Sequence, residues 1–525
     1  MVVPELRPWR AARPHVTRLA NAVRPRLAAA RPQSARLANA MKPQVKRLTT
    51  VKTWQYTAGA ATAGLALTAV VVTAAGPWDS TGQRTAERDR AVALEHTGGA
   101  DHDRGSGTTG AAPEPAPSAS SVLAGLGGAT NTVKSAPSGE ALSAVLGPLL
   151  EDGALGSRRT AAVVDVATGK RLYGVGAGTA LTPASTTKIA TAVAALSAMG
   201  PEHRLTTRAA LEPDTDELVL VGGGDPTLTA RKDAEGWASL RDLAAKTAKA
   251  LKKDGVRKVT LSYDTTLYAG SALHPIGVDA NLALVSPLMA DEARTDDSTS
   301  GTAVRAPDPA DDAARKFAAF LADEGIKTTS PGPSKATDRA ETLAEVSSPP
   351  LSTLVERMLT NSDNDIAEAL ARQTAVATKT RADFDGGGKA IRAELKKLQL
   401  PVSGVSFKDG SGLNREDKLT ADLLTALLAK AGDPDHPELR SVLTGLPVAG
   451  FTGTLTTRYT PDGAAGVVRA KTGTLTGVNT LAGTVVDQDG RLLAFAFLAS
   501  DTASKDAAQS ALDRAATALA ACGCG

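Results

Sequence analysis

A serine and a lysine stand three residues apart in the segment ASTTKIATAVAAL, which runs from Ala184 to Leu196. Helix positions i and i+3 share a face, so Ser185 and Lys188 are expected to lie side by side where a helix begins after Pro183. A serine hydroxyl becomes a strong nucleophile when a base takes its proton, and a buried lysine with a lowered pKa can be that base. The pair predicts nucleophilic catalysis. The alternative is a helix-capping serine with a surface lysine, because a Ser-x-x-Lys spacing alone is a weak signal.

Activation of a serine by histidine has less support in this sequence. Beyond the N-terminal 136 residues the histidines are His203, His274 and His436, each in an unrelated polar context. The chain also lacks the Gly-x-Ser-x-Gly elbow of many hydrolases. A lysine base is therefore favoured over a Ser–His–Asp triad.

Two further segments strengthen this interpretation. NSDNDIAEALA places Ser362–Asn364 before a helical pattern, and AKTGTLTG places Lys471–Gly473 at the start of a strand. Taken singly, the first is a helix N-cap and the second a polar strand edge. Together with Ser185 and Lys188, and in this order, they form the three-part signature of penicillin-binding proteins and class A β-lactamases.

The signature implies a role for each polar side chain. Ser362 would relay a proton to the leaving amine, and Asn364 would hold a substrate amide. Lys471 would supply positive charge, and Thr472 a hydroxyl, for a substrate carboxylate.

The backbone of the third segment has an expected role as well. Gly473 would leave room for an extended substrate along the strand. The backbone N–H groups of Ser185 and Thr474 would form the oxyanion hole. No metal or organic cofactor is required for this chemistry.

The spacing of the segments points to one subfamily. Ser185 and Ser362 lie 177 positions apart, which is too far for a β-lactamase or a compact carboxypeptidase. The chain resembles the class C, low-molecular-mass penicillin-binding proteins, which are D-alanyl-D-alanine carboxypeptidase/endopeptidases of peptidase family S13. The resemblance covers about Ser138 to Arg514 and includes VGGGDPTL, YDTTLY, KDGSGLNR and PVAGFTGTLTTR.

The resemblance implies a fold and two more binding residues. The fold would be α/β (α+β), a penicillin-binding-protein/serine β-lactamase-like transpeptidase fold with a large mixed α/β insertion between the first two motifs. Arg415 and Asp279 would bind a diaminopimelate-like side chain. Alternatively, Arg415 forms a loop salt bridge and Asp279 is a turn residue. The aromatic residues usual in the family near that aspartate are missing, and aliphatic ones such as Val278 stand there.

The N-terminal part differs strongly from the rest in charge. Residues 1–56 hold twelve Lys/Arg and one acidic residue, so they carry +11, and the remainder must carry −8 to give the net charge of +3. An acidic body disfavours nucleic acid binding. Within the head, RPHVTRLANAVRP returns as RPQSARLANAMKP after eighteen residues. The head either contacts anionic lipid or a cytoplasmic partner, or simply orients the chain in the membrane.

The segment 57–78 has no charged residue and is long enough to cross a bilayer. It predicts an uncleaved anchor, with the head in the cytoplasm and the remainder outside. A cleaved signal peptide and secretion are the alternative. The Gly/Ser/Ala/Pro-rich stretch 79–136 predicts a flexible tether.

Hydrophobic patterning divides the folded part. Strands early and late around a helical middle predict one catalytic domain, 137–201 with 350–521, and an inserted region, 202–349. Hairpins are expected at Ala167–Lys170 and Gln488–Gly490. Residues 522–525 would be an unstructured tail, and one residue between Cys522 and Cys524 is too short for an easy disulfide.

The sequence therefore predicts a membrane-tethered serine DD-peptidase. It would cleave D-alanyl-D-alanine in peptidoglycan stem peptides through an acyl-enzyme, with cleavage of D-alanyl cross-links as the close variant. β-Lactams would acylate the same serine. The alternatives are a β-lactamase, which would need a deacylating water, and a β-lactam or muropeptide sensor that acylates without turnover.

Overall fold

The computed structural model describes residues 136–459 and 463–523. The predicted head (1–56), anchor (57–78) and all but the last residue of the tether (79–136) lie outside these residues. Within the part of the chain that is described, no helix is both long and apolar enough to cross a bilayer.

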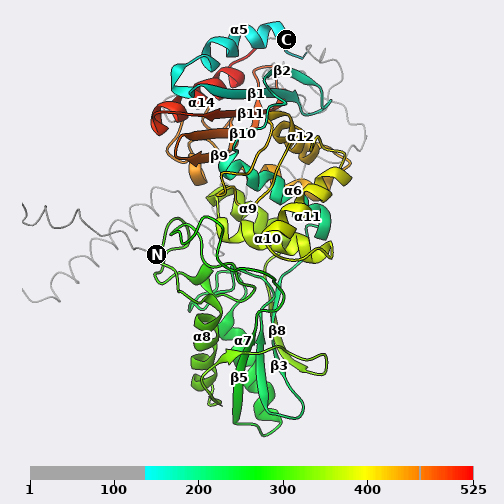
Figure 1. The fold of residues 1–525 in the computed structure, drawn as a ribbon, viewed down its shortest axis with the longest axis vertical. Coiled ribbons are helices and arrows are strands. Elements are labelled where there is room, and N and C mark those ends of the chain that lie inside the picture. Colours follow the sequence, from blue (N-terminus) through cyan, green and yellow to red (C-terminus); the bar gives the residue numbers. More distant parts are fainter. Residues whose placement is uncertain (1–135, 460–462, 524–525) are drawn as a thin grey trace, which may run out of the picture. The chain divides into compact units, whose positions relative to one another are not determined.

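One antiparallel sheet is built from the two ends of the described chain (Figure 1). Its strand order is β2-β1-β11-β10-β9. The strands are β1 (Arg158–Asp165), β2 (Arg171–Val175), β9 (Arg469–Leu475), β10 (Val478–Val486) and β11 (Leu492–Ser500). Both predicted hairpins are confirmed, because β1 pairs with β2 and β10 with β11.

This sheet is covered on both faces. Phe495 of β11 belongs to the core shared with α5 (Gly139–Leu150) and α14 (Lys505–Ala520). Its neighbour Ala494 belongs to the core on the other face. Successive strand residues point to opposite faces, so a strand buried on both sides is apolar along its length, as residues 492–499 of β11 are.

Helices form the second half of the catalytic domain. They are α6 (Thr187–Met199), α9 (Leu351–Asn361), α10 (Asn364–Ala377), α11 (Phe384–Lys397), α12 (Ala421–Gly432) and α13 (Ser441–Thr444). Short 3₁₀ turns also occur in the catalytic domain: η1 (Gly153–Leu155), η2 (Ala184–Thr186), η4 (Pro437–Leu439) and η5 (Gly453–Leu455). Every residue of α6 from Thr187 to Leu196 is buried. A helix that is buried all round belongs at the centre of a domain.

The inserted region forms a second sheet with its own core, drawn in green in Figure 1. Its elements are β3 (Thr206–Leu211), β4 (Glu217–Val221), α7 (Leu240–Lys253), β5 (Lys258–Asp264), η3 (Asp291–Ala293), α8 (Pro309–Asp323), β6 (Lys327–Thr328), β7 (Gly332–Pro333) and β8 (Glu341–Ser347). The order is β6-β5-β4-β3-β8, and β7 also pairs with β5. Helix α7 connects the parallel pair β4 and β5, so the insertion is mixed α/β, as predicted.

The expectation of an unstructured tail is wrong at Cys522. This residue is buried in the core beneath α14, and it is disulfide-bonded. Its carbonyl accepts the N–H of Gln488 at 3.3 Å. The last helix thus delivers the chain end to the sheet, while residues 524–525 lie outside the described part.

Candidate active site

Ser185 lies in η2, the 3₁₀ turn that leads directly into α6. Ala184 has φ 49°, in the left-handed region, so the backbone turns sharply just before the serine. Two glycines allow close packing here. A Cβ on Gly412 would lie 1.9 Å from the Ala184 carbonyl oxygen, and one on Gly473 would lie 2.7 Å from that of Pro183. The space left by Gly473 therefore brings strand β9 against the serine turn, a role the sequence did not suggest.

Lys188 is fully buried beside the serine. Its Nζ lies 3.1 Å from Ser185 Oγ, 2.7 Å from Asn364 Oδ1 and 2.7 Å from the Ser411 carbonyl oxygen. Burial lowers the pKa of Lys188 to about 8, and nearby carboxylates oppose that shift. A neutral Lys188 is thus accessible near physiological pH, as a base for Ser185 requires.

The segment Ser362–Asn364 forms the junction between α9 and α10. Ser362 has φ 59° and ends α9, while Asp363 caps α10 by accepting a backbone N–H of its first turn. The prediction of a helix cap therefore holds for Asp363. Its neighbours Ser362 and Asn364 instead contact Lys471 and Lys188. Asn364 donates from Nδ2 to the carbonyl of Asn281 in the inserted region, at 3.0 Å.

Lys471 joins the second and third motifs. It is fully buried, and its Nζ donates to Ser362 Oγ at 2.9 Å and to the Thr472 carbonyl at 2.8 Å. Burial and the charge of Lys188 hold the pKa of Lys471 well below its usual value. The structure thus brings together all five side chains predicted to act in catalysis.

Strand β9 is an edge strand of the five-stranded sheet. One side pairs with β10, and an edge strand offers its other side to an extended peptide. Thr472 Oγ1 donates to Thr454 Oγ1 of η5 at 3.0 Å, and Thr474 Oγ1 accepts from Gln509 Nε2 at 3.2 Å. The oxyanion-hole role of the Ser185 and Thr474 N–H groups stays a prediction.

One protein family matches most of the described chain. The family model described as D-Ala-D-Ala carboxypeptidase 3 (S13) matches residues 142–292 and 292–519. The chain belongs to the S13 family. It is 34% identical over 429 residues to a carboxypeptidase of Mycobacterium tuberculosis, covering 79% of this chain and 90% of the relative. It is 29% identical over 425 residues to a D-alanyl-D-alanine carboxypeptidase of an Actinomadura species, covering 66% and 78%.

The fold of this S13 protein also has a solved counterpart. The crystal structure of penicillin-binding protein 4 from Haemophilus influenzae matches with a TM-score of 0.58 at 22% identity, covering 71% of this chain and 97% of that one. The likeness confirms the predicted fold class. Family membership confirms the predicted resemblance and makes the protein a serine-type D-Ala-D-Ala peptidase.

The two side chains expected to bind the substrate side chain are placed differently in this S13 chain. Arg415 is exposed, and its guanidinium donates to the carbonyl of Thr476, just past the end of β9, at 2.9 Å. Asp279 accepts the N–H and the side-chain amide of Asn281 at 2.8 and 2.6 Å. Asp279 therefore shapes the turn whose Asn281 carbonyl holds Asn364, which matches the turn-residue alternative.

Sequence reasoning missed a buried carboxyl cluster beside the second motif, made of Glu292, Asp363 and Asp365. Arg294 and Arg357 each bind Glu292 at 2.8 Å, and Arg305 binds Asp365 at 2.8 Å. Burial, then the charge of Glu292, raises the pKa of Asp363 well above its usual value. Glu292 pairs with Arg357 of α9 and Arg305 pairs with Asp365 of α10, so the cluster forms ion pairs between the inserted region and the helices on both sides of the second motif. The only local signal was the acidic residue on each side of Asn364.

Proposed function

We propose that this S13 protein cleaves the D-alanyl-D-alanine bond of peptidoglycan stem peptides through an acyl-enzyme on Ser185. The observation that carries the proposal is the 3.1 Å contact between Lys188 Nζ and Ser185 Oγ, together with the lowered pKa of this buried lysine. The names of its relatives, which include D-alanyl-D-alanine carboxypeptidases, support the same substrate class.

The contacts of Lys188 explain how its lone pair is aimed. A neutral lysine keeps two hydrogens, and Asn364 Oδ1 and the Ser411 carbonyl, both at 2.7 Å, can accept them. The lone pair is then left for the Ser185 hydroxyl hydrogen. As that proton moves to Lys188, Ser185 Oγ forms a bond to the substrate carbonyl carbon.

The leaving amine needs a proton when the peptide C–N bond breaks. Ser362 Oγ accepts from Lys471 Nζ at 2.9 Å, so Ser362 can pass its own hydroxyl proton to the amine nitrogen. D-alanine leaves, and water then hydrolyses the Ser185 ester, which returns the serine. Lys471 also provides the charge that a terminal substrate carboxylate requires.

We further propose that the catalytic domain works outside the cytoplasmic membrane, tethered by residues 57–78, where peptidoglycan is found. The support is the uncharged length of that segment and the excess of Lys and Arg before it.

Intact-protein mass spectrometry of the chain with benzylpenicillin tests the proposed reaction. We expect a stable adduct that peptide mapping places on Ser185 and that Ser185→Ala abolishes. Rapid loss of penicillin without an adduct would instead indicate a β-lactamase. A stable adduct without D-alanine release from a stem peptide would indicate a sensor.

A further inference from the structure

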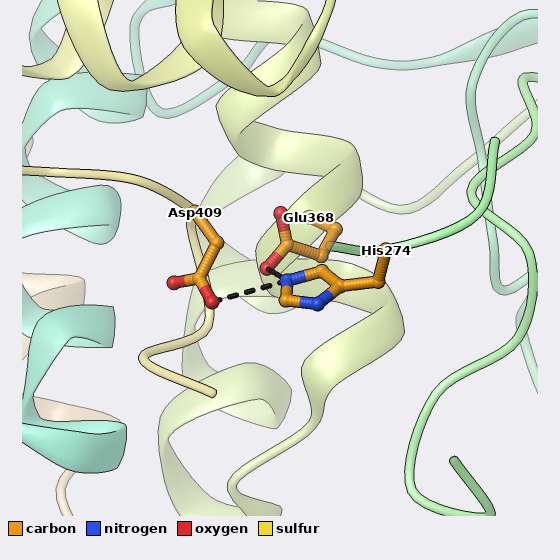
Figure 2. Close-up of side chains that lie close together, drawn as sticks. All are labelled: His274, Glu368 and Asp409. Atoms are coloured by element: carbon orange, nitrogen blue, oxygen red, sulfur yellow. Dashed lines mark hydrogen bonds and ion pairs between the residues drawn. The ribbon is translucent and has the colours of Figure 1, made fainter. Parts of the chain in front are cut away.

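His274 comes from the inserted region but is buried inside the catalytic domain. Figure 2 shows one nitrogen of its imidazole facing both Glu368 of α10 and Asp409, which lies between α11 and α12. Nε2 lies 3.1 Å from Asp409 Oδ2 and 3.7 Å from Glu368 Oε1. The ring of Phe384 packs edge-on against the imidazole, with 5.0 Å between the two ring centroids. None of these groups belongs to the three motifs.

The hydrogen bonds define which nitrogen of His274 carries the hydrogen. The backbone N–H of Ile276 donates to Nδ1 at 3.2 Å, so Nδ1 keeps its lone pair and Nε2–H donates to Asp409. Although burial lowers the pKa of His274, the bond to Asp409 and both carboxylate charges raise it. Protonation of Nδ1 would place a second hydrogen against the Ile276 N–H, so we favour the neutral ring in this geometry.

The cluster does not have the form of a metal site. Both oxygens of Glu368 accept the Gly410 N–H at 3.1 Å, and one also accepts that of Ser411 at 2.9 Å. Asp409 accepts the N–H of Gly412 at 2.7 Å and of Asn414 at 2.6 Å. Each carboxylate is already held by backbone donors, and Nε2 has no free lone pair, so the groups form a hydrogen-bonded unit around the turn 409–412.

That turn touches the catalytic pair directly. The carbonyl of Ser411 accepts from Lys188 Nζ at 2.7 Å. The carbonyl of Gly410 accepts from Thr191 Oγ1, one helical turn further along α6, at 2.6 Å. The charges of Asp409 and Glu368 also raise the pKa of Lys188 against the effect of burial. The position and the charge of this turn therefore both act on Lys188.

We propose that His274 is a positioning residue for Lys188, because its Nε2–H holds Asp409 and the 409–412 turn and offsets the carboxylate charge facing the lysine. The proposal rests on the role of Lys188 as base for Ser185. It makes the inserted region a contributor to the chemistry of the site, through a histidine that touches neither the substrate nor the serine.

The sign of the expected effect follows from the groups that face the cluster. They are Lys188 from α6, Glu368 and Arg372 from α10, and Asp409 and Asp417 from the chain between α11 and α12. Loss of the Nε2–H removes a positive partial charge, or a full one if the ring is protonated, and leaves Asp409 less compensated. In both cases the pKa of Lys188 rises. The acid limb, which is the pH range where the acylation rate rises as Lys188 loses its proton, therefore moves to higher pH.

The test is the second-order rate of acylation by benzylpenicillin between pH 5.5 and 9.5, using the full chain. His274→Asn keeps an acceptor for the Ile276 N–H but is too short to reach Asp409, whereas His274→Gln extends an amide N–H toward it. We expect the limb to move up by about one pH unit in His274→Asn, which lowers acylation at pH 7 about tenfold, and to stay near the wild-type value in His274→Gln.

A second variant, a folding check and a control complete the test. His274→Ala removes the donor without adding an amide, so it should move the acid limb of the pH profile as far as His274→Asn does. Arg372 donates to the carbonyls of Ala269 and Ser271 and so holds the segment before His274 without the imidazole. The variants should therefore fold, and thermal melting checks this. The control is His436→Asn, because the half-buried ring of His436 contacts Glu438 and not Asp409.

An unchanged limb in folded His274→Asn and His274→Ala would overturn the inference, as would equal displacement in His274→Gln. Failure of the proposed function has a different signature, the absence of a Ser185 adduct in the wild-type chain, and would overturn both.

Discussion

The two buried lysines of the site, Lys188 and Lys471, have different surroundings. Lys188 contacts three oxygen acceptors, and four carboxylates raise its pKa against burial, which leaves the value at about 8. Lys471 contacts Ser362 Oγ and the Thr472 carbonyl, and the charge of Lys188 adds to the effect of burial. Among the described residues, no carboxylate forms an ion pair with Lys471.

The difference assigns the two lysines to different tasks. The protein's own carboxylates keep the charge state of Lys188 balanced near neutrality, which suits a general base. Lys471 lacks an internal counter-charge, so a carboxylate arriving with the substrate would complete its environment and favour its protonated form.

The largest effect is expected when the base is removed. Lys188→Met keeps the side-chain length but cannot take the Ser185 proton, so acylation by benzylpenicillin should fall by about 10³-fold or more. Mass spectrometry over time measures the rate, and Lys389→Met, an exposed lysine paired with Asp385, is the control. Near-normal acylation of Lys188→Met would contradict the assignment of the base.

Removal of Lys471 should be less severe and should depend on the substrate. In Lys471→Met, Ser362 loses its donor and the site loses its charge, so D-alanine release from a stem peptide should fall about 10²-fold. The wild-type chain should also prefer a substrate with a free terminal carboxylate over its C-terminal amide, and the variant should not. If the variant still discriminated between the two substrates, Lys471 would not be the carboxylate partner.

Removal of one carboxylate near Lys188 should move the pH profile by a smaller amount and in the opposite direction to His274→Asn. Asp365 raises the pKa of Lys188, and Asn in its place can still accept the Ala283 N–H that Asp365 holds at 2.9 Å. Asp365→Asn should therefore lower the acid limb by about half a pH unit. The pH dependence of acylation measures this, and a limb that moved upward would show that carboxylate charge does not set the pKa of Lys188.

The smallest effect is expected at Arg415. Its guanidinium is exposed and donates to one backbone carbonyl, so Arg415→Ala should leave folding and benzylpenicillin acylation within about two-fold of wild type. If Arg415 binds a charged stem-peptide side chain, KM for that peptide should rise by about 5- to 10-fold with little change in kcat. An unchanged KM would leave Arg415 as a loop residue that ties to Thr476.

Local pattern was sufficient to predict much of this protein. Ser185 and Lys188 meet because an interval of three residues places them together where η2 leads into α6. The patterning around Gln488–Gly490 predicted the hairpin that β10 and β11 form. The order of the three motifs predicted the family, and the distance from Ser185 to Ser362 predicted the insertion between them.

Tertiary structure alone decided what the inserted region does at the site. The imidazole of His274 meets Asp409, 135 positions away, and the Asn281 carbonyl meets Asn364, 83 positions away. Gly473 serves the packing of β9 against Pro183. None of these contacts has a sequence period, because each joins segments that lie far apart along the chain. Chemistry carried by neighbouring residues is therefore readable from the sequence, whereas the contacts that His274 and Asn281 make at the site depend on how the two regions pack together.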